Sequence, residues 1–264
     1  MNTDCAFWIG STHQVCQDYG IAGQGAVILS DGCSSSPDTD IGARLLAHSA
    51  ARLSPKALDR PECAVRAAAK CAGLLGLPNT CLDATLLTIH AENGVFTVRC
   101  VGDGVVALGR QDGGIDVFSV AFAASYPLYP SYFLDDARRA QWTAQANNAK
   151  TLQQWTLTPG GAANEGETRK SENAVECFSG TAVEYRFAAI LSDGVHSFTQ
   201  TVPTETSRTT VAVPVTAVLA ELLAFKSSRG QFVERRVAAF RKECLKRGWQ
   251  HSDDVSLGVI WLGG

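Results

Sequence analysis

Short apolar runs, bounded by glycine, proline and polar residues, recur along the chain and predict a protein rich in buried strands. Two of these runs end in the same five residues, Ile-Leu-Ser-Asp-Gly, at positions 28–32 and 190–194. A weaker version, Cys-Val-Gly-Asp-Gly, stands at 100–104, and the last apolar run follows Asp253 and Asp254. The pattern therefore puts a carboxylate at one end of four different predicted strands.

Strands are predicted wherever an apolar or alternating run of this length occurs. They cover residues 5–9, 25–30, 82–90, 95–101, 105–109, 115–120, 152–157, 186–192 and 255–262. Asn93-Gly94 is a strong hairpin signal because both residues tolerate positive φ. Such short turns join only antiparallel neighbours, so we expect the strands between 82 and 120 to form an antiparallel meander.

Helical patterns separate these strands. The predicted helices cover residues 39–53, 61–75, 135–145, 215–225 and 231–247. Asp38 or Thr39 is the expected cap of the first helix, and Gly248 ends the last one, whose apolar residues recur every three or four positions. Antiparallel strands combined with pairs of helices favour α+β layers in which helices cover sheets.

Three segments follow neither pattern. Residues 159–173 are rich in Gly, Glu and Asn, and we expect a mobile surface loop there. Residues 199–209 are polar and threonine-rich, which predicts a linker. Residues 125–133 are rich in aromatic residues and proline, and they form either a flap that faces the substrate or an irregular packed loop.

The chain has 264 residues, 45% of them apolar and 19% charged, and a formal net charge of −3. Because no composition shift divides it, and the two Ile-Leu-Ser-Asp-Gly motifs need a shared core to meet, we expect one domain over residues 1–264. The charge gives no sign of a nucleic-acid partner. No apolar run reaches the roughly 18 residues of a membrane span, and the first residues lack a signal-peptide pattern. A cytoplasmic protein without membrane contact is expected.

The sequence contains nine cysteines, an odd number, and no Cys-x-x-Cys pair. We therefore expect reduced cysteines that are mostly small buried hydrophobes rather than disulfides or zinc ligands.

The acidic strand ends have two interpretations. Asp-Gly after a strand is first of all a turn, because glycine accepts positive φ and aspartate bonds to its own backbone. Several carboxylates gathered at sheet edges, however, repel one another unless a proton or a cation offsets their charge. Hard divalent cations prefer such oxygen ligands, so the repetition favours a carboxylate-built metal centre.

Six motifs in a fixed order resemble the protein phosphatase 2C family. They are Gln17-Asp18, Asp31-Gly32, Asp83-Ala84-Thr85, Gly102-Asp103-Gly104, Ser192-Asp193-Gly194 and Asp253-Asp254-Val255-Ser256-Leu257. Each motif is weak alone, but together they span nearly the whole chain, and residues 31–36 look like a bacterial branch of the family. The resemblance implies an α+β fold, a four-layer αββα sandwich of two antiparallel sheets flanked by helices.

The resemblance also implies two divalent cations, Mg²⁺ or Mn²⁺, at one edge of the sandwich. Asp31 would bridge both ions, and the Gly32 carbonyl would bind one of them. Asp193 and Asp253 would hold the other ion. The same oxygen ligands suit both metals, so the sequence does not choose between them.

Two further acidic residues have implied roles. Asp18 would hold metal-bound water from behind the ligands, and Asp103 would contact a third, weaker ion. The implied activity is hydrolysis of phosphoserine or phosphothreonine in a phosphorylated protein substrate, by attack of a hydroxide that bridges the two cations.

The chain departs from the family pattern at several positions. His13 stands where members commonly have an arginine that binds substrate phosphate; it can still donate a hydrogen bond, or it is a plain loop residue. Cys33 replaces a histidine proposed as the general acid, and its simplest interpretation is a small buried residue. Ser197 replaces an acidic residue and weakens the third-metal site. Gln17 replaces a glutamate, and Asp254 replaces an asparagine.

Two other functions stay open. The departures also suit a pseudophosphatase, a binding or regulatory module on the same fold, although Asp31, Asp193 and Asp253 are all present and favour catalysis. A protein that binds calcium or magnesium structurally would need a loop of the type Asp-x-Asp-x-Asp-Gly, which residues 38–42 resemble only in part, without a closing glutamate. The sequence has neither a Cys-x5-Arg phosphatase loop nor a phosphate-binding P-loop.

Overall fold

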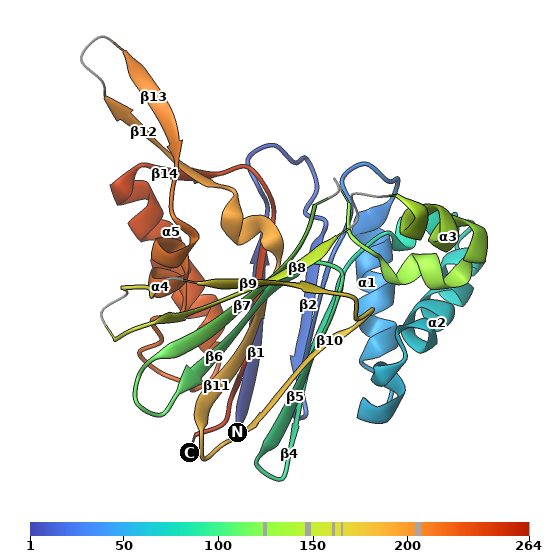
Figure 1. Ribbon diagram of the computed structural model, residues 1–264, viewed down its shortest axis with the longest axis horizontal. Coiled ribbons are helices and arrows are strands. Elements are labelled where there is room, and N and C mark those ends of the chain that lie inside the picture. Colours follow the sequence, from blue (N-terminus) through green and yellow to red (C-terminus); the bar gives the residue numbers. More distant parts are fainter. Residues whose placement is uncertain (124–125, 146–148, 160–161, 165, 204–206, 264) are drawn as a thin grey trace.

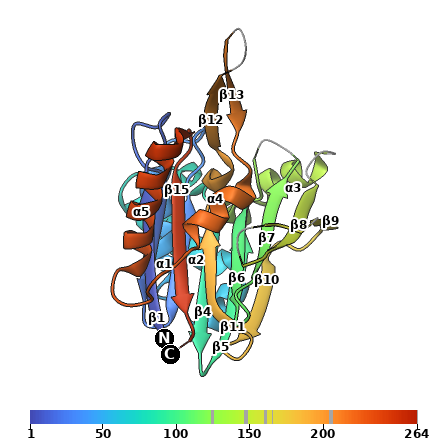
Figure 2. The same ribbon diagram turned by 90° about the vertical axis from the view of Figure 1, so that its left-hand side faces the viewer.

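The computed structural model describes residues 1–123, 126–145, 149–159, 162–164, 166–203 and 207–263. Over this part of the chain, two large antiparallel sheets lie face to face between two groups of helices (Figures 1 and 2). The α+β fold and the αββα layers predicted from the sequence are confirmed.

The larger sheet has seven strands in the order β1 (Asn2–Trp8), β15 (Val255–Trp261), β11 (Tyr185–Leu191), β6 (Gly104–Arg110), β7 (Ile115–Phe122), β8 (Lys150–Leu157) and β9 (Glu167–Ser171). The second sheet has the order β10 (Glu176–Thr181), β5 (Val95–Val101), β4 (Leu86–Glu92), β3 (Ala26–Asp31) and β2 (Asp18–Gly23). A small third sheet combines β13 (Arg208–Ala212), β12 (Phe198–Pro203) and β14 (Trp249–His251), and the β12–β13 hairpin projects from the body in Figure 1.

Three apolar layers hold the sandwich together. The seven-stranded sheet packs against α4 (Val215–Leu222) and α5 (Phe232–Arg247). The inward faces of the two sheets form the central layer. The five-stranded sheet packs against α1 (Thr39–Ala50) and α2 (Pro61–Leu74). Alternation of side chains along each strand explains this division, because neighbouring residues point to opposite faces.

The helices form largely where their patterns predict them. In α5, five buried side chains share the face on the sheet, namely Phe232, Val233, Val237, Phe240 and Cys244. Gly248 ends that helix with φ 68°, as predicted. Asp38 precedes α1 but makes no capping hydrogen bond through its side chain. Because α1 already begins at Thr39, residues 38–42 do not form the calcium-type loop that they partly resemble.

The predicted meander is wrong. β4 pairs with β5, and β6 pairs with β7, but the two hairpins belong to different sheets. The chain crosses from one sheet to the other at Gly102 and Gly104, whose φ values of 90° and 139° suit glycine. Asp103 lies between these glycines and is therefore placed where the two sheets meet.

Two segments predicted as irregular contain strands. The predicted loop at 159–173 includes β9, which pairs with β8, although residues 160–161 and 165 lie outside the described part. The predicted linker at 199–209 includes most of β12 and the start of β13, and residues 204–206 lie outside the described part. Both segments form edge or projecting strands, whose polar sides face solvent.

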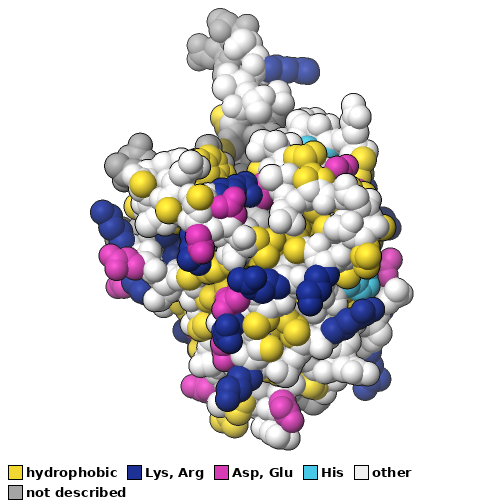
Figure 3. All heavy atoms as spheres, turned by 90° about the vertical axis from the view of Figure 1, so that its right-hand side faces the viewer, with side chains coloured by type: hydrophobic (Ala, Val, Ile, Leu, Met, Phe, Trp, Pro, Cys, Tyr) yellow, Lys and Arg dark blue, Asp and Glu magenta, His cyan; other side chains and the backbone are white. Residues whose placement is uncertain are grey.

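The other predictions have mixed outcomes. All nine cysteines are free, as expected, but the expectation that most are buried is wrong: only Cys81, Cys100 and Cys244 are buried, four are partly exposed, and Cys71 and Cys177 are exposed. The side of the molecule that α1 and α2 cover shows charged side chains of both signs scattered among apolar ones (Figure 3). Among the residues that the structure describes, no helix is both long and apolar enough to cross a membrane.

Candidate metal centre

The acidic strand ends meet at one edge of the sandwich. Asp31 ends β3 of the five-stranded sheet, and Asp103 lies between β5 and β6, where the chain crosses to the seven-stranded sheet. Asp193 follows β11, and Asp253 precedes β15, so both belong to the seven-stranded sheet. These ends lie at the top of the two sheets in Figure 1. Stacking of the sheets thus brings together residues from four distant parts of the sequence.

One cavity of about 270 Å³ joins these residues. It is lined by Asp31, Gly32, Cys33, Ser34, Ser35, Thr85, Asp103, Pro127, Tyr129, Asp193 and Asp253. Four carboxylates face this space, and none of the described residues that line it is Lys or Arg. The cavity therefore concentrates negative charge without a basic side chain in its wall.

Packing explains the glycine of each Ile-Leu-Ser-Asp-Gly motif. Neither Gly32 nor Gly194 has φ in the left-handed region, so the interpretation of these motifs as positive-φ turns is wrong. A Cβ at Gly194 would lie 1.8 Å from the Asp254 carbonyl oxygen, and one at Gly32 would lie 2.8 Å from the Thr39 carbonyl oxygen. Glycine lets Asp193 and Asp31 follow their strands directly into the cavity wall.

Asp18 lies behind the cavity rather than in its wall. It pairs with Asp31 across β2 and β3 and is completely buried. The Ser192 hydroxyl donates to its Oδ2 over 2.7 Å, while its Oδ1 has no hydrogen-bond partner among the described residues. Burial raises the pKa of Asp18 to about 7, against the opposing effect of hydrogen bonds from neighbouring side chains.

Burial and repulsion by neighbouring carboxylates raise the pKa of three carboxyl groups in the cavity, those of Asp31, Asp103 and Asp253. The pKa of Asp31 lies well above its ordinary value, because the group is desolvated and then because Asp18 and Asp193 are close. Burial and the charge of Asp193 raise the pKa of Asp103 to about 8. The same two causes raise the pKa of Asp253. A cation in the cavity would remove this electrostatic penalty.

His13 is the basic side chain beside this cluster. Its Nε2 lies 3.6 Å from Asp253 Oδ1, and its Nδ1 lies 3.0 Å from Asp254 Oδ2. Asp254 is buried and accepts hydrogen bonds from the backbone amides of Gly10 (2.7 Å) and Gln17 (2.6 Å). Asp254 thus fixes the loop that carries His13, a role that the sequence did not reveal.

Two further departures from the family pattern, Cys33 and Ser197, have structural consequences. Cys33 is half-buried and lines the cavity, so it is not simply a core residue. Burial acts to raise its pKa, but hydrogen bonds with Ser35 and Tyr129 outweigh this effect and lower it. Ser197 donates to the Gly194 carbonyl (2.8 Å) and accepts from the Asp253 amide (3.3 Å), which ties two motif loops together.

A second hollow of about 250 Å³ adjoins the cavity on the other side of Cys33 and Tyr129. It is bounded by the aromatic segment predicted as a flap or packed loop and by α3 (Asp136–Ala144). Pro127 and Tyr129 line the metal-centre cavity and are also buried, so the segment is packed against the body and borders the cavity at the same time. Ser125, at the start of the predicted segment, lies outside the described residues.

Asp83 has a different role from the other motif aspartates. It is 1% exposed and receives both guanidinium arms of Arg138, at 2.8 and 2.7 Å. The hydroxyls of Ser36 and Ser131 also donate to it. Its partner Arg138 lies on α3, far away in the sequence. The sequence predicted that helix but not its contact with Asp83. Asp83 therefore anchors α3 and the aromatic segment.

The carboxylates share a cavity without converging on one point. Within the described part of the chain, no group of three or more His, Cys, Asp or Glu side chains already forms a metal-ligand arrangement. Of the predicted metal residues, Asp31, Gly32, Asp103, Asp193 and Asp253 line the cavity, and Asp18 supports it from behind.

Known proteins share this fold. The structure is similar to the serine/threonine phosphatase PstP/Ppp of Mycobacterium tuberculosis, with 16% identity and a TM-score of 0.55 over 99% of this chain and 98% of that one. It is similar to PppA of Pseudomonas aeruginosa, described as a key regulatory component of T6SS (12%, 0.53, 97% and 95%), and to a bacterial serine phosphatase (10%, 0.54, 100% and 98%). At these identities the likeness shows the fold alone.

Two comparisons of the sequence complement the structural one. No curated protein sequence matches the chain. A family profile described as "Protein phosphatase 2C" matches residues 10–239, which is most of the chain. On this match the chain belongs to the protein phosphatase 2C family.

Proposed function

We propose that the protein is a metal-dependent phosphatase that hydrolyses phosphoserine or phosphothreonine in proteins. The observation that carries this proposal is the single cavity lined by Asp31, Asp103, Asp193 and Asp253. Family membership supports the same reaction class. Carboxylates gathered around one partly enclosed cavity are unfavourable for the fold unless function requires them, because their charges repel one another and are partly removed from water.

The donor set fits a hard divalent cation. All the proposed ligands are oxygens, namely the carboxylates of Asp31, Asp193 and Asp253 and the carbonyl of Gly32, as Mg²⁺ and Mn²⁺ prefer. The Oδ1 of buried Asp18, which has no hydrogen-bond partner among the described residues, is one more acceptor next to Asp31, where it would hold water. Asp103 would hold a third, weaker ion.

Two bound cations would supply the positive charge that a phosphate dianion needs and would lower the pKa of water near it. The chain's own residues would do the rest. Asp31 and Asp193, fixed by the close packing of Gly32 and Gly194, would hold the site at the junction of the two sheets. The Asp18 carboxylate, with Ser192 bound to its other oxygen, would orient water from behind.

His13 would bind the substrate phosphate. Its Nε2 lies beside both Asp253 and Ser34, at 3.6 and 3.3 Å, so it borders the proposed ligands. A hydrogen bond from this nitrogen would position one phosphate oxygen. Asp254 would act as a positioning residue, since its two backbone hydrogen bonds fix the His13 loop.

The test is release of phosphate from a phosphothreonine peptide with Mn²⁺, with Mg²⁺ and with a chelator. We expect turnover only with metal, and a loss of about 10³-fold or more in Asp31→Asn, because metal ions contribute several kcal/mol to such reactions. Asp112→Asn is the matched control, since Asp112 is 67% exposed in the β6–β7 hairpin. It should keep full activity.

A folded protein without metal-dependent turnover would contradict the enzyme proposal and leave the pseudophosphatase. Full activity in Asp31→Asn would instead show that the site assignment is wrong while the reaction class stands.

A further inference from the structure

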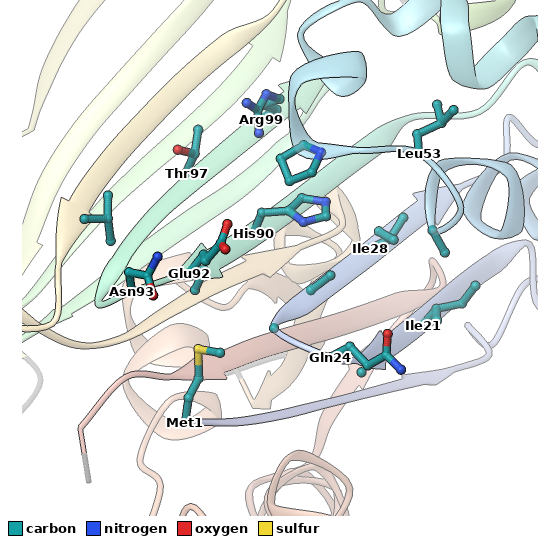
Figure 4. Close-up of a pocket in the computed structure, with 17 residues that line it drawn as sticks. Met1, Ile21, Gln24, Ile28, Leu53, His90, Glu92, Asn93, Thr97 and Arg99 are labelled. Carbon is teal, nitrogen blue, oxygen red and sulfur yellow. The ribbon is translucent and has the colours of Figure 1, made fainter.

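The five-stranded sheet is longer than the two helices that cover it. α1 and α2 pack over Ile28, Leu86 and Val101. Beyond Ala50, the end of α1, the same face of the sheet opens into a hollow of about 960 Å³ at the lower end of the sheet in Figure 1. We call this space the sheet-end hollow; it is bounded by residues of β2 to β5, the segment 51–55 and Met1 (Figure 4).

Three buried polar atoms on this face have no hydrogen-bond partner among the described residues. They are Thr88 Oγ1, His90 Nε2 and Arg99 Nη1. Thr88 lies directly opposite Arg99 across β4 and β5, and His90 follows two positions along β4, so the three side chains stand together on one face. Figure 4 shows Thr97, His90 and Arg99 among the residues that line the hollow.

The burial of these groups makes the missing partners significant. Thr88 is 1% exposed and Arg99 is 7% exposed. A buried donor without a partner bears the full desolvation penalty, and native structures rarely leave such groups unpaired. Three such groups side by side, next to the sheet-end hollow, indicate a binding place for a molecule that accepts hydrogen bonds.

The nearby charges restrict what this molecule is. Arg99 already binds Asp59 Oδ1 through Nε and Nη2, both at 2.6 Å, and its Nη1 has no partner among the described residues. Burial, and then the charge of Arg99, lower the pKa of His90, so the ring stays neutral. Glu92 also lines the hollow. Asp59 offsets the charge of Arg99 and Glu92 adds a negative charge, so the site offers hydrogen-bond donors without net positive charge, which suits a singly charged oxyanion better than a phosphate dianion.

We propose that the sheet-end hollow binds a small amphiphilic carboxylate. Its carboxylate accepts hydrogen bonds from Arg99 and His90, and its apolar part lies along Ile21, Ile28 and Leu53, which line the same space. The size of the hollow is within the range of small-molecule sites. Apolar walls with a few convergent polar groups are typical of such sites.

This site is separate from the proposed metal centre. Ile28 and Asp31 lie three residues apart on β3, which is about 10 Å along a strand, and they face the hollow and the cavity respectively. The inference goes beyond the phosphatase proposal and does not depend on it. Its test accordingly measures binding and not hydrolysis.

The experiment is calorimetric titration of the full chain, in the presence of a chelator, with decanoate, decanol and decyl phosphate below their micellar concentrations. We expect decanoate to bind at one site, and decanol and decyl phosphate to bind at least about tenfold more weakly. Arg99→Gln should weaken decanoate binding about tenfold or more. Arg60→Gln is the matched control, because Arg60 is 71% exposed, pairs with Glu62 and does not line the hollow.

A second variant fills the space without touching Arg99. Thr97→Phe places a ring in the hollow from β5 and should also weaken decanoate binding at least about tenfold. Circular dichroism checks that each variant is folded. If one variant does not fold, the other variant alone tests the proposal. Equal binding of decanoate and decanol to the unmodified chain, tighter binding of decyl phosphate, or no decanoate binding up to about 1 mM would each overturn the proposal.

Discussion

The two ends of the five-stranded sheet have opposite chemistry. At the upper end, Asp31 and Asp103 face a cavity whose described lining includes no Lys or Arg. At the lower end, His90 and Arg99 present buried donors that lack an acceptor. In both places the fold holds polar groups that it does not satisfy from its own described side chains, and in both the missing charge or hydrogen-bond partner is of a definite kind. The difference indicates a cation at one end and an anionic ligand at the other.

Asp83 shows what a satisfied acid looks like in the same sheet. It belongs to the same motif series, but Arg138, Ser36 and Ser131 all donate to it. Such partners offset the desolvation of this buried carboxylate, and the loss of either member of the ion pair is strongly destabilising. Asp83 is therefore the reference with which the acids that lack such partners are compared.

The largest expected effect on stability is that of replacing Asp83. Asp83→Asn should lower the free energy of unfolding by about 3 kcal/mol, because it removes one partner of a buried ion pair and leaves Arg138 unpaired. Urea denaturation followed by circular dichroism measures it. Asp136→Asn is the control, since Asp136 is 88% exposed, and it should change stability by less than about 1 kcal/mol. Equal losses in the two variants would remove the contrast.

His13 is predicted to contribute to substrate binding. His13→Ala should raise KM for a phosphothreonine peptide about tenfold and leave kcat within about threefold, as expected when a ground-state hydrogen bond to phosphate is lost. Steady-state kinetics with saturating Mn²⁺ measure both constants. His48, exposed on α1, provides the control variant His48→Ala. An unchanged KM in His13→Ala would show that the residue does not bind phosphate.

Removing one of the unsatisfied acids should stabilise the metal-free protein. Asp103→Asn is expected to raise the free energy of unfolding in chelator by about 1 kcal/mol at pH 7, because a desolvated and repelled carboxyl group is lost. The pKa of Asp103 is raised to about 8 in the fold. The folded protein therefore favours the protonated Asp103 carboxyl group. This contribution to stability is complete below the ordinary pKa of the group and is lost as pH rises toward about 8. The advantage of the variant should grow over that window.

The same urea series at several pH values tests this expectation. A variant that is less stable than the unmodified chain in chelator, or that keeps the same pH slope, would show that Asp103 is not under electrostatic strain.

The smallest expected effect lies at the lower end of the sheet. Because burial lowers the pKa of His90, the folded protein favours the neutral ring, and stability should fall as pH drops below the ordinary value of 6.5. His90→Gln should make this fall shallower between about pH 7.5 and pH 5. Thermal unfolding at stepped pH measures the slope. His48→Gln should keep it, and an unchanged slope in His90→Gln would mean that His90 is not desolvated.

The sequence predicted those parts of the fold that depend on local patterns. The periodic apolar face of α5 and the stop at Gly248 follow from helix geometry alone. β9, β12 and β13 were missed because their residues are polar, and they are strands only through pairing with distant partners. The crossing at Asp103 was missed for a related reason, since a hairpin signal does not show which sheet the next hairpin joins.

The candidate site divides in the same way. The acidic strand ends and their order identified the cavity lining, and five of the six predicted metal residues lie in it. The sequence analysis gave Asp83 no metal role, but it did not reveal the ion pair of Asp83 with Arg138, because the two residues are 55 positions apart. The sheet-end hollow was invisible because it results from the lengths of α1 and β3 to β5 relative to one another.

The most direct test of the account is calorimetric titration of the metal-free protein with Mn²⁺. We predict binding to the unmodified chain, a loss of at least about tenfold in affinity in Asp31→Asn, and no change in the exposed control Asp112→Asn. Absence of Mn²⁺ binding to the folded protein, or equal binding to Asp31→Asn, would contradict the assignment of the carboxylate cavity as a metal centre.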